Sequence, residues 1–347
     1  MAQKTENRGF EQLKKDLKNK QFARCYVLYG KEDYLQRYYF AALRKQIVDP
    51  LTEDFNAHHL TGETITMQLL SDCVEALPMM AERSFVHVDD IDLFSLPEGD
   101  REQLMQILEQ LPEYCCLVFT YSSSEFVADN RKKLYKSLEK NAVLVEFGDQ
   151  SESDLKAWIQ RHFRASGKVI SPWLCTYLLG RCGTSMTRLD GEIEKICAYS
   201  GAEEIVQQDI DAVVEPTLEA VVYDISDAIV ARNFAQAIDK LQTILKMGEL
   251  PIKLLAAIGA QMRRLNSARI LIGEGKGAGE LQTIYKIKSS WAADKTMKQA
   301  KGLSDKFCSQ AVLLCRDTDY KLKTSYDDPQ RLLELLVCSL AEVARND

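Results

Sequence analysis

Residues 25–39 read CYVLYGKEDYLQRYY, and this stretch decides the fold of the first part of the chain. The run CYVLYG (25–30) is continuously apolar, which is typical of a strand buried on both faces. A short turn follows it, and a helical pattern then runs over residues 34–47. A buried strand that passes directly into a helix indicates a parallel sheet covered by helices.

The same alternation continues to residue 149. Extended segments are expected at 55–60, 84–90, 115–122 and 142–147, and helices at 66–76, 98–111 and 131–139. We therefore expect a mostly parallel sheet with helices on both faces. Residues 1–20 precede this pattern, and the sequence leaves open whether they form a helix packed on the sheet or a loose tail.

The strand pattern stops after residue 150, so the fold class is α/β plus all-α. A group of helices is expected first, with a boundary at Pro216, at 154–167, 172–181, 186–199 and 208–214. Longer amphipathic helices are expected next, at 218–231, 234–247, 251–272, 291–300, 304–322 and 328–344. These patterns predict three domains, over residues 1–149, 150–216 and 217–347.

The composition is that of a globular protein and not of a disordered or membrane-spanning one. The 347 residues are 46% hydrophobic and carry a net charge of −7. No apolar run approaches the roughly 18 residues needed to cross a bilayer, and the polar start of the chain lacks the apolar core of a signal peptide. We expect a cytoplasmic protein that does not bind membranes.

The charge is uneven along the chain. Residues 1–150 carry 18 basic and 25 acidic side chains, whereas residues 217–347 carry 19 and 16. Because phosphate neutralisation needs clustered Lys and Arg, any contact with nucleic acid is expected to be local. The stretch QMRRLNSAR (261–269) offers Arg263 and Arg264 for it, although a solvated helix face explains the same pattern.

The ten cysteines do not have the spacing of a metal or redox site. Zinc sites and redox pairs use short CxxC-type spacings, and the chain contains neither CxxC nor CxxH. Most of the cysteines lie among apolar residues, as Cys175 and Cys338 do, and are expected to be small buried hydrophobes. We expect no bound metal and no cofactor.

The turn after the first strand is similar to a phosphate-binding loop but lacks its chemistry. Such a loop needs GxxxxGK[ST], in which backbone N–H groups and the Lys hold the phosphates. Here Gly30 is followed at once by Lys31, Glu32 and Asp33, whose two carboxylates would repel a triphosphate. The later pair Asp89–Asp90 could suggest a magnesium site, but without a phosphate loop such a site has nothing to act on, and a solvated strand end explains the pair better. The sequence offers no catalytic grouping.

The stretch LPMM (77–80) is unusual because it places four apolar residues where a turn is expected. Turns are normally polar, and the flexible, polarisable Met side chain suits adaptable binding surfaces. If this stretch is exposed, it would form a contact with another protein through Leu77, Pro78, Met79 and Met80. The sequence leaves equally open that the two methionines pack into the local core.

Five stretches in order resemble the delta-subunit family of the bacterial DNA polymerase III clamp loader, over essentially the whole length. They are YVLYGKEDYLQRYY (26–39), LPMMAERSFVHVDDIDLF (77–94), LLGRCGTSMTRLDGEIEKICAYSG (178–201), VVYDISDAIVARNFAQAIDKLQTILKMGELPIKLLAAIGAQMRRL (221–265) and CRDTDYKLKTSYDDPQRLLELLV (315–337).

This resemblance implies an AAA+-like α/β domain, a small helical lid domain and a helical collar domain that joins a ring of five loader subunits. It implies a subunit of a DNA-directed DNA polymerase complex that does not hydrolyse ATP itself. Such a subunit binds the ring-shaped sliding clamp (the beta subunit) and opens one interface, so that the clamp can be loaded on primed DNA. The matching contact is Leu77–Met80, where Met79–Met80 replaces a pair that is often Leu-Phe.

Two other functions remain open from the residues alone. An active AAA+ ATPase is favoured only by the strand–helix order and by Asp89–Asp90, and it would require ATP binding. A DNA-binding replication accessory protein would require strong, salt-dependent binding to duplex DNA.

Overall fold

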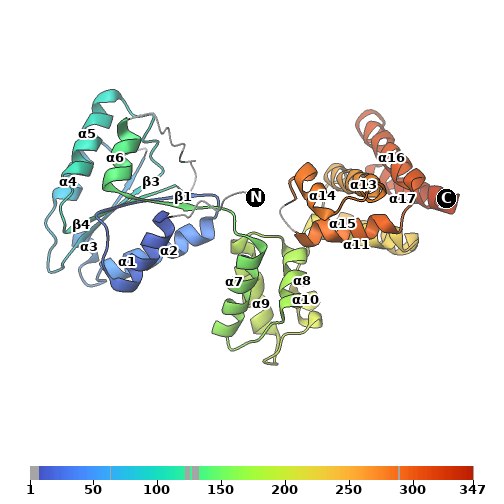
Figure 1. Cartoon of the computed structure of the whole chain (residues 1–347), viewed down its shortest axis with the longest axis horizontal. Helices are drawn as coiled ribbons and strands as arrows, with labels where there is room; N and C mark the ends of the chain where they lie inside the picture. The colour runs from blue at the N-terminus through green and yellow to red at the C-terminus, as the bar shows by residue number, and fades with distance from the viewer. Residues whose placement is uncertain (1–7, 63, 122–125, 127–132, 288–289, 347) are drawn as a thin grey trace. The chain divides into compact units, whose positions relative to one another are not determined.

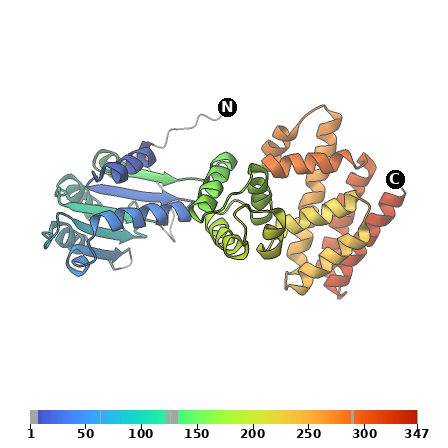
Figure 2. The same cartoon turned by 90° about the horizontal axis from the view of Figure 1, so that it is seen from below.

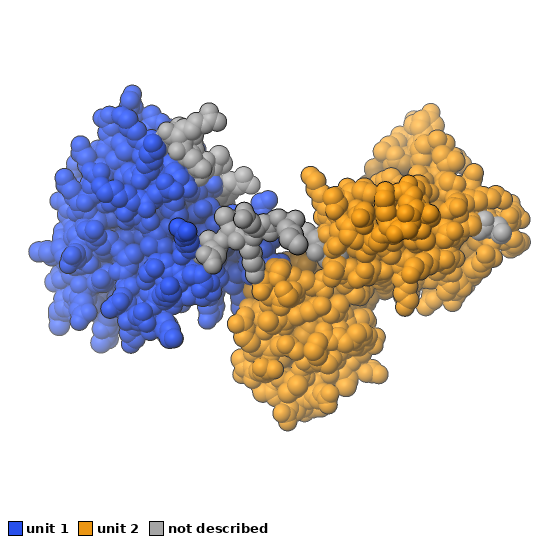
Figure 3. Space-filling model, in the orientation of Figure 1, with its two compact units in different colours: residues 1–150 blue, residues 151–347 orange. Residues whose placement is uncertain are grey.

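The structure is a computed structural model that describes residues 8–62, 64–121, 126, 133–287 and 290–346. The chain forms two compact units, Met1–Gln150 and Ser151–Asp347 (Figure 3). The first unit is α/β and the second is built of helices (Figure 1). The predicted division of the second unit at residue 216 stays a prediction.

The sheet of the first unit has five strands in the order β2-β3-β4-β1-β5. Every pairing is parallel; Cys25 lies opposite Leu117 and Tyr26 opposite Val143. The predicted parallel sheet is therefore confirmed. The strands are β1 (Cys25–Gly30), β2 (Ala57–Thr61), β3 (Ser84–Asp89), β4 (Cys115–Thr120) and β5 (Val143–Phe147).

Helices cover both faces of this sheet (Figure 2). The helices α4 (Met67–Glu75), α5 (Glu98–Glu109) and α6 (Lys133–Asn141) pack on one face through an apolar core that includes Leu70, Leu104 and Leu138. The helices α1 (Arg8–Asn19) and α2 (Asp33–Ile47) pack on the other face. The beginning of the predicted helix at 131–139 lies outside the described residues.

Helix α1 decides between the two interpretations of the first residues. Leu13 is fully buried against the sheet, and the carboxylate of Asp16 accepts a 2.7 Å hydrogen bond from the Tyr26 hydroxyl. A carboxylate is buried at low cost only when it is hydrogen-bonded. Residues 8–19 are therefore a helix fixed to the first strand and not a loose tail.

The extended segment expected at 55–60 is partly wrong. Residues Glu53–Asn56 form a single helical turn, α3, and the strand begins only at Ala57. The reason is tertiary, because the Asn56 side chain is buried and bonded to a loop 23 residues later. Periodicity cannot detect such a turn.

The second unit is helical, and among the residues that the structure describes its extended structure is limited to one isolated bridge between Val169 and Glu204. It includes α14, a helix not expected from the sequence because it begins inside the glycine-rich stretch 273–280. The helices are α7 (Glu152–Ala165), α8 (Pro172–Cys182), α9 (Met186–Tyr199), α10 (Gln207–Val213), α11 (Leu218–Val230), α12 (Phe234–Lys246), α13 (Pro251–Gly273), α14 (Ala278–Tyr285), α15 (Ser290–Lys301), α16 (Asp305–Thr324) and α17 (Pro329–Arg345). None of the helices described in either unit is long and apolar enough to span a bilayer.

The cysteines are free thiols, and seven of the ten are buried. Cys175 is buried as expected, but Cys338 is exposed, so that prediction is wrong. Helix α17 turns Leu336, Val337 and Leu340 toward the core, and position 338 falls on the opposite side of a 3.6-residue turn. An apolar neighbourhood in sequence does not determine which face of a helix a residue occupies.

Candidate functional site

The loop between α4 and β3 presents its apolar side chains to solvent. We call residues 77–83 the methionine loop. Within it Leu77 is 73% exposed, Met79 55% and Met80 93%, and Pro78 is half-buried. The alternative in which both methionines pack into the core does not hold in this structure. Exposed apolar clusters of this kind mark protein contacts.

Asn56 fixes the backbone of this loop. Its side-chain amide donates a 2.9 Å hydrogen bond to the carbonyl of Met79, and its Oδ1 accepts a 2.7 Å bond from the Met79 N–H. Asn56 is only 1% exposed, so both bonds are partly buried and are stronger than bonds in open water. Met80 follows in a left-handed conformation with φ of +53°. The two methionine side chains are thus carried by an ordered backbone.

Helix α3 adds an exposed aromatic ring close to the same loop. Phe55 is 59% exposed and immediately precedes the Asn56 that holds Met79. Phe55 was not expected at this site, because its segment was expected to be extended. The residue order carries no signal for it, because the exposure of Phe55 and the burial of Asn56 arise only in the folded chain.

The turn over Gly30–Asp33 is closed against the end of β5. Gly30 has φ of +130°, and a Cβ there would lie 2.3 Å from the carbonyl oxygen of Phe147. The backbone N–H of Glu32 donates a 3.0 Å hydrogen bond to that same carbonyl, and burial raises the pKa of the Glu32 carboxyl. Only Lys31 and Glu32 separate β1 from α2, so the turn is too short to wrap around phosphates.

The ends of β3 and β4 hold a chain of hydrogen bonds. The Thr120 hydroxyl donates a 2.6 Å bond to Asp89 Oδ1, and His87 Nε2 lies 2.7 Å from the same hydroxyl. Gln36, buried in α2, donates a 3.0 Å bond to the carbonyl of Tyr121. Asp89 is therefore partly satisfied within the protein. The described residues contain no group of three His, Cys, Asp or Glu side chains that could hold a metal ion.

His87 is neutral at ordinary pH. Burial, assisted by the neighbouring His59, lowers the pKa of His87 from 6.5 to about 4. The two imidazole rings are stacked with centroids 4.6 Å apart, and Phe40 packs against His87 from α2. With Thr120 donating to Asp89, a neutral His87 is left to donate its own N–H to the threonine oxygen. This histidine is a structural part of the sheet.

Arg263 and Arg264 do not form one basic surface. Arg264 pairs with Glu219 at 2.9 Å, with only 24% of its side chain exposed. Arg263 is exposed. Consecutive helical residues diverge by about 100°, so the two guanidinium groups leave α13 in different directions.

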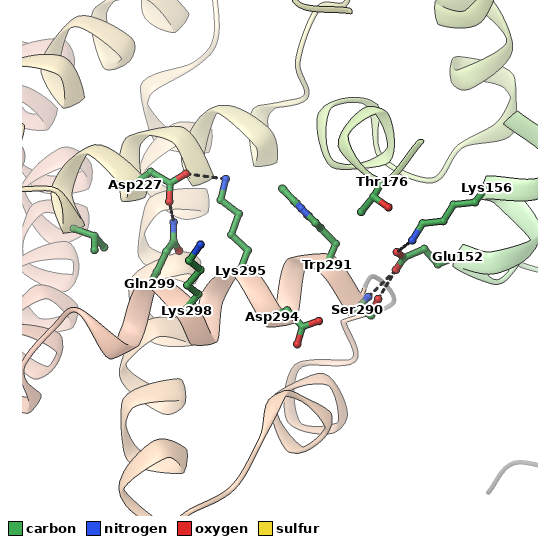
Figure 4. A pocket seen from close by; sticks show the side chains of 11 residues that line it. Glu152, Lys156, Thr176, Asp227, Ser290, Trp291, Asp294, Lys295, Lys298 and Gln299 are labelled. Carbon is green, nitrogen blue, oxygen red and sulfur yellow. Dashed lines mark hydrogen bonds and ion pairs between the residues drawn. The ribbon is translucent and has the colours of Figure 1, made fainter. Parts of the chain in front are cut away.

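A hollow in the second unit lies between α7, α11 and α15 (Figure 4). Glu152 accepts hydrogen bonds from the backbone N–H and the hydroxyl of Ser290, at 3.0 and 2.7 Å, and pairs with Lys156. Lys295 pairs with Asp227 at 2.8 Å. These polar groups form hydrogen bonds and ion pairs with one another, so the hollow is a packing contact between helices.

Trp291 provides the apolar part of this packing contact. Its ring packs edge-on against Tyr223, with the Lys295 ammonium 5.0 Å from the indole centroid. The ring also lies so close to Gly180 of α8 that a Cβ there would come within 2.9 Å of it. A glycine at position 180 is therefore required for this packing.

Two family models match the chain. The model for the DNA polymerase III delta subunit matches residues 26–148, and the model for the C-terminal domain of that subunit matches residues 219–340. The chain belongs to the DNA polymerase III delta-subunit family. The resemblance found in the sequence is confirmed, and the site is therefore the site of a delta-family protein.

Members of the delta family match this chain over nearly its whole length. The DNA polymerase III subunit delta of Bacillus subtilis is 27% identical over 332 residues, which cover 94% of this chain and 95% of that protein. The solved Bacillus subtilis DNA clamp loader delta protein has a TM-score of 0.61 and 25% identity, covering 96% of this chain and 99% of that one. This match confirms the predicted fold class of an α/β part joined to helical parts.

Proposed function

We propose that this clamp-loader delta subunit binds the ring-shaped sliding clamp and opens one of its interfaces, without hydrolysing ATP itself. The observation that carries the proposal is the methionine loop, which holds two exposed methionine side chains on a backbone fixed by Asn56. Leu77, Pro78, Met79 and Met80 would enter an apolar pocket on the clamp.

Binding energy is sufficient for such a task. A closed clamp is in equilibrium with a small fraction of open or strained rings, and a ligand that prefers the open form shifts this equilibrium. The methionine loop is already ordered, so little conformational entropy is lost on binding. No bond needs to be made or broken by this subunit.

The turn at Gly30–Asp33 supports the absence of ATP hydrolysis. It has two residues where a phosphate loop needs a longer run, and its carboxylates would face the phosphates. Asp89, the candidate magnesium ligand, already accepts a hydrogen bond from Thr120. We therefore propose that nucleotide acts through the other subunits of the loader.

The remaining partners follow from the delta family. We propose that residues 217–347 join the other loader subunits in a five-membered ring, with residues 150–216 as the lid domain, and that primed DNA is met only within the complex. Arg263 is the better of the two candidate arginines for a DNA contact, because Arg264 is paired with Glu219.

A clamp-release assay tests the proposal. Clamp is assembled on nicked circular DNA, and the full chain is added without nucleotide. We expect faster loss of clamp from the circles with the wild-type chain, and the unassisted rate with Met79→Ala/Met80→Ala. No acceleration by the wild-type chain, or acceleration only with ATP, would contradict the proposal. Tight ATP binding by the chain alone would favour the active ATPase instead.

A further inference from the structure

A basic hollow lies where the strands of the first unit begin. Arg24 immediately precedes β1, Arg83 immediately precedes β3, and Lys140 is near the end of α6, which leads into β5. These three cations line one hollow together with Glu113 and neighbouring backbone. We call it the basic pocket. The parallel topology is what assembles it, because parallel strands all begin at one edge of the sheet.

Both arginines are positioned but not neutralised. Arg24 Nη1 donates a 3.1 Å hydrogen bond to the carbonyl of Leu111, and Arg83 Nη1 donates one of 3.1 Å to the carbonyl of Phe22. A guanidinium has five N–H donors, so each keeps donors for another acceptor. Among the residues that the structure describes, no ion pair joins Arg24, Arg83 or Lys140 to a carboxylate.

The basic pocket and the methionine loop share this edge of the sheet. Arg83 lies three residues after Met80 and is the last residue of the loop. Asn56, which holds Met79, directly precedes β2, and β2 pairs with β3. An apolar surface therefore passes into a cationic one over the beginnings of neighbouring strands, and a partner seated on the two methionines would also face Arg83.

We propose that the partner bound by the methionine loop carries carboxylates beside its apolar pocket, and that these engage Arg24, Arg83 and Lys140. The inference rests on the proposed function, so the partner is the sliding clamp. Arginine forks match carboxylates in a bidentate geometry, and complementary charge around an apolar contact speeds association and fixes orientation. Protein is favoured over nucleic acid because the neighbouring surface is apolar and residues 1–150 carry more acidic than basic side chains.

The test reverses one exposed charge and compares it with a matched control. Lys140→Glu places a carboxylate in the basic pocket. Lys136→Glu makes the same change one turn earlier on α6, outside that pocket. Binding of the full chain to the clamp is measured by surface plasmon resonance at 50 and 200 mM NaCl. We expect Lys140→Glu to weaken binding by about tenfold at the lower salt, mostly through slower association, and Lys136→Glu to stay within about twofold.

The salt dependence of the clamp affinity is the second measurement, and Lys140→Gln controls for a folding defect. The affinity of the wild-type chain should fall as salt rises, because screening weakens the charged contacts, and Lys140→Glu should flatten this dependence. Lys140→Gln, a milder change, should give an intermediate loss. Each variant is checked for an unchanged melting temperature.

The outcomes separate this inference from the proposed function. If Met79→Ala/Met80→Ala abolishes clamp binding while Lys140→Glu leaves its rate and salt dependence unchanged, the clamp contact stands and the basic pocket is no part of it. If Lys140→Glu instead abolishes binding to duplex DNA and leaves clamp binding intact, the pocket is a phosphate site and the inference is overturned. If the wild-type chain does not bind the clamp, both fall.

Discussion

Replacing both methionines of the loop by alanine should remove most of the clamp affinity. Met79 is 55% exposed and Met80 93% exposed in the chain alone, so both have large apolar surfaces left to bury. Full burial of a Met side chain contributes about 1.5–3 kcal/mol. Scaled by the exposed fractions, the pair contributes about 2–4 kcal/mol, which corresponds to a Kd raised roughly 30- to 1,000-fold.

The assay is a calorimetric titration of the clamp with wild-type chain and with Met79→Ala/Met80→Ala. Met247→Ala is the matched control, because that methionine is 65% exposed but lies in the second unit. All three proteins should unfold at similar denaturant concentrations, since exposed substitutions change stability by only about 0.5 kcal/mol. A double variant that binds within about threefold of wild type, which is roughly 0.65 kcal/mol, would refute this reasoning and move the contact elsewhere.

Three further predictions concern the residues that support the site and the fold. Asn56→Ala should lower the free energy of unfolding by about 1–3 kcal/mol in a urea titration and weaken clamp binding by loosening the loop, although both methionines remain; unchanged binding would mean that loop order is irrelevant. The pKa of His87 is lowered to about 4 in the folded chain. As the pH falls, this histidine is therefore protonated in the unfolded chain before it is protonated in the folded chain. Stability should fall as pH drops from 6.5 to 4, by at most about 3 kcal/mol, and His87→Gln should reduce this slope; equal slopes would disprove a buried neutral histidine. Gly180→Ala should lower unfolding free energy by about 1–3 kcal/mol and shift the emission of Trp291, whereas Gly191→Ala, a helical site with open space, should not destabilise.

The sequence predicts the strands and most helices because their signals are local. The apolar run at 25–30 forms β1, and the helix expected at 154–167 forms α7 (Glu152–Ala165), close to where periodicity indicates them. Strands buried on both faces cannot be amphipathic, and this continuous apolarity distinguishes a parallel sheet from a solvated one. The stretch at Met79–Met80 was noticeable because turns are normally polar, but the sequence left equally open whether both methionines are exposed or packed into the core.

Contacts between residues far apart in the chain could not be predicted from the sequence. The amide of Asn56 reaches the backbone of Met79 across 23 residues, and no periodicity encodes that pairing. The same is true of Arg24 and Arg83, which are brought to one hollow only by the strand order. Helix α14 was missed for the same reason, because tertiary packing of Leu281 overrides the weak local helix signal of its glycines.

We propose that this delta subunit recognises the clamp by itself, through a surface that needs no nucleotide. The most direct measurement titrates the full chain with the sliding clamp of the same organism, first without nucleotide and then with ATP and magnesium. We expect saturable binding with the same Kd in both conditions. Absence of binding without nucleotide, or binding that appears only when ATP is added, would contradict this proposal.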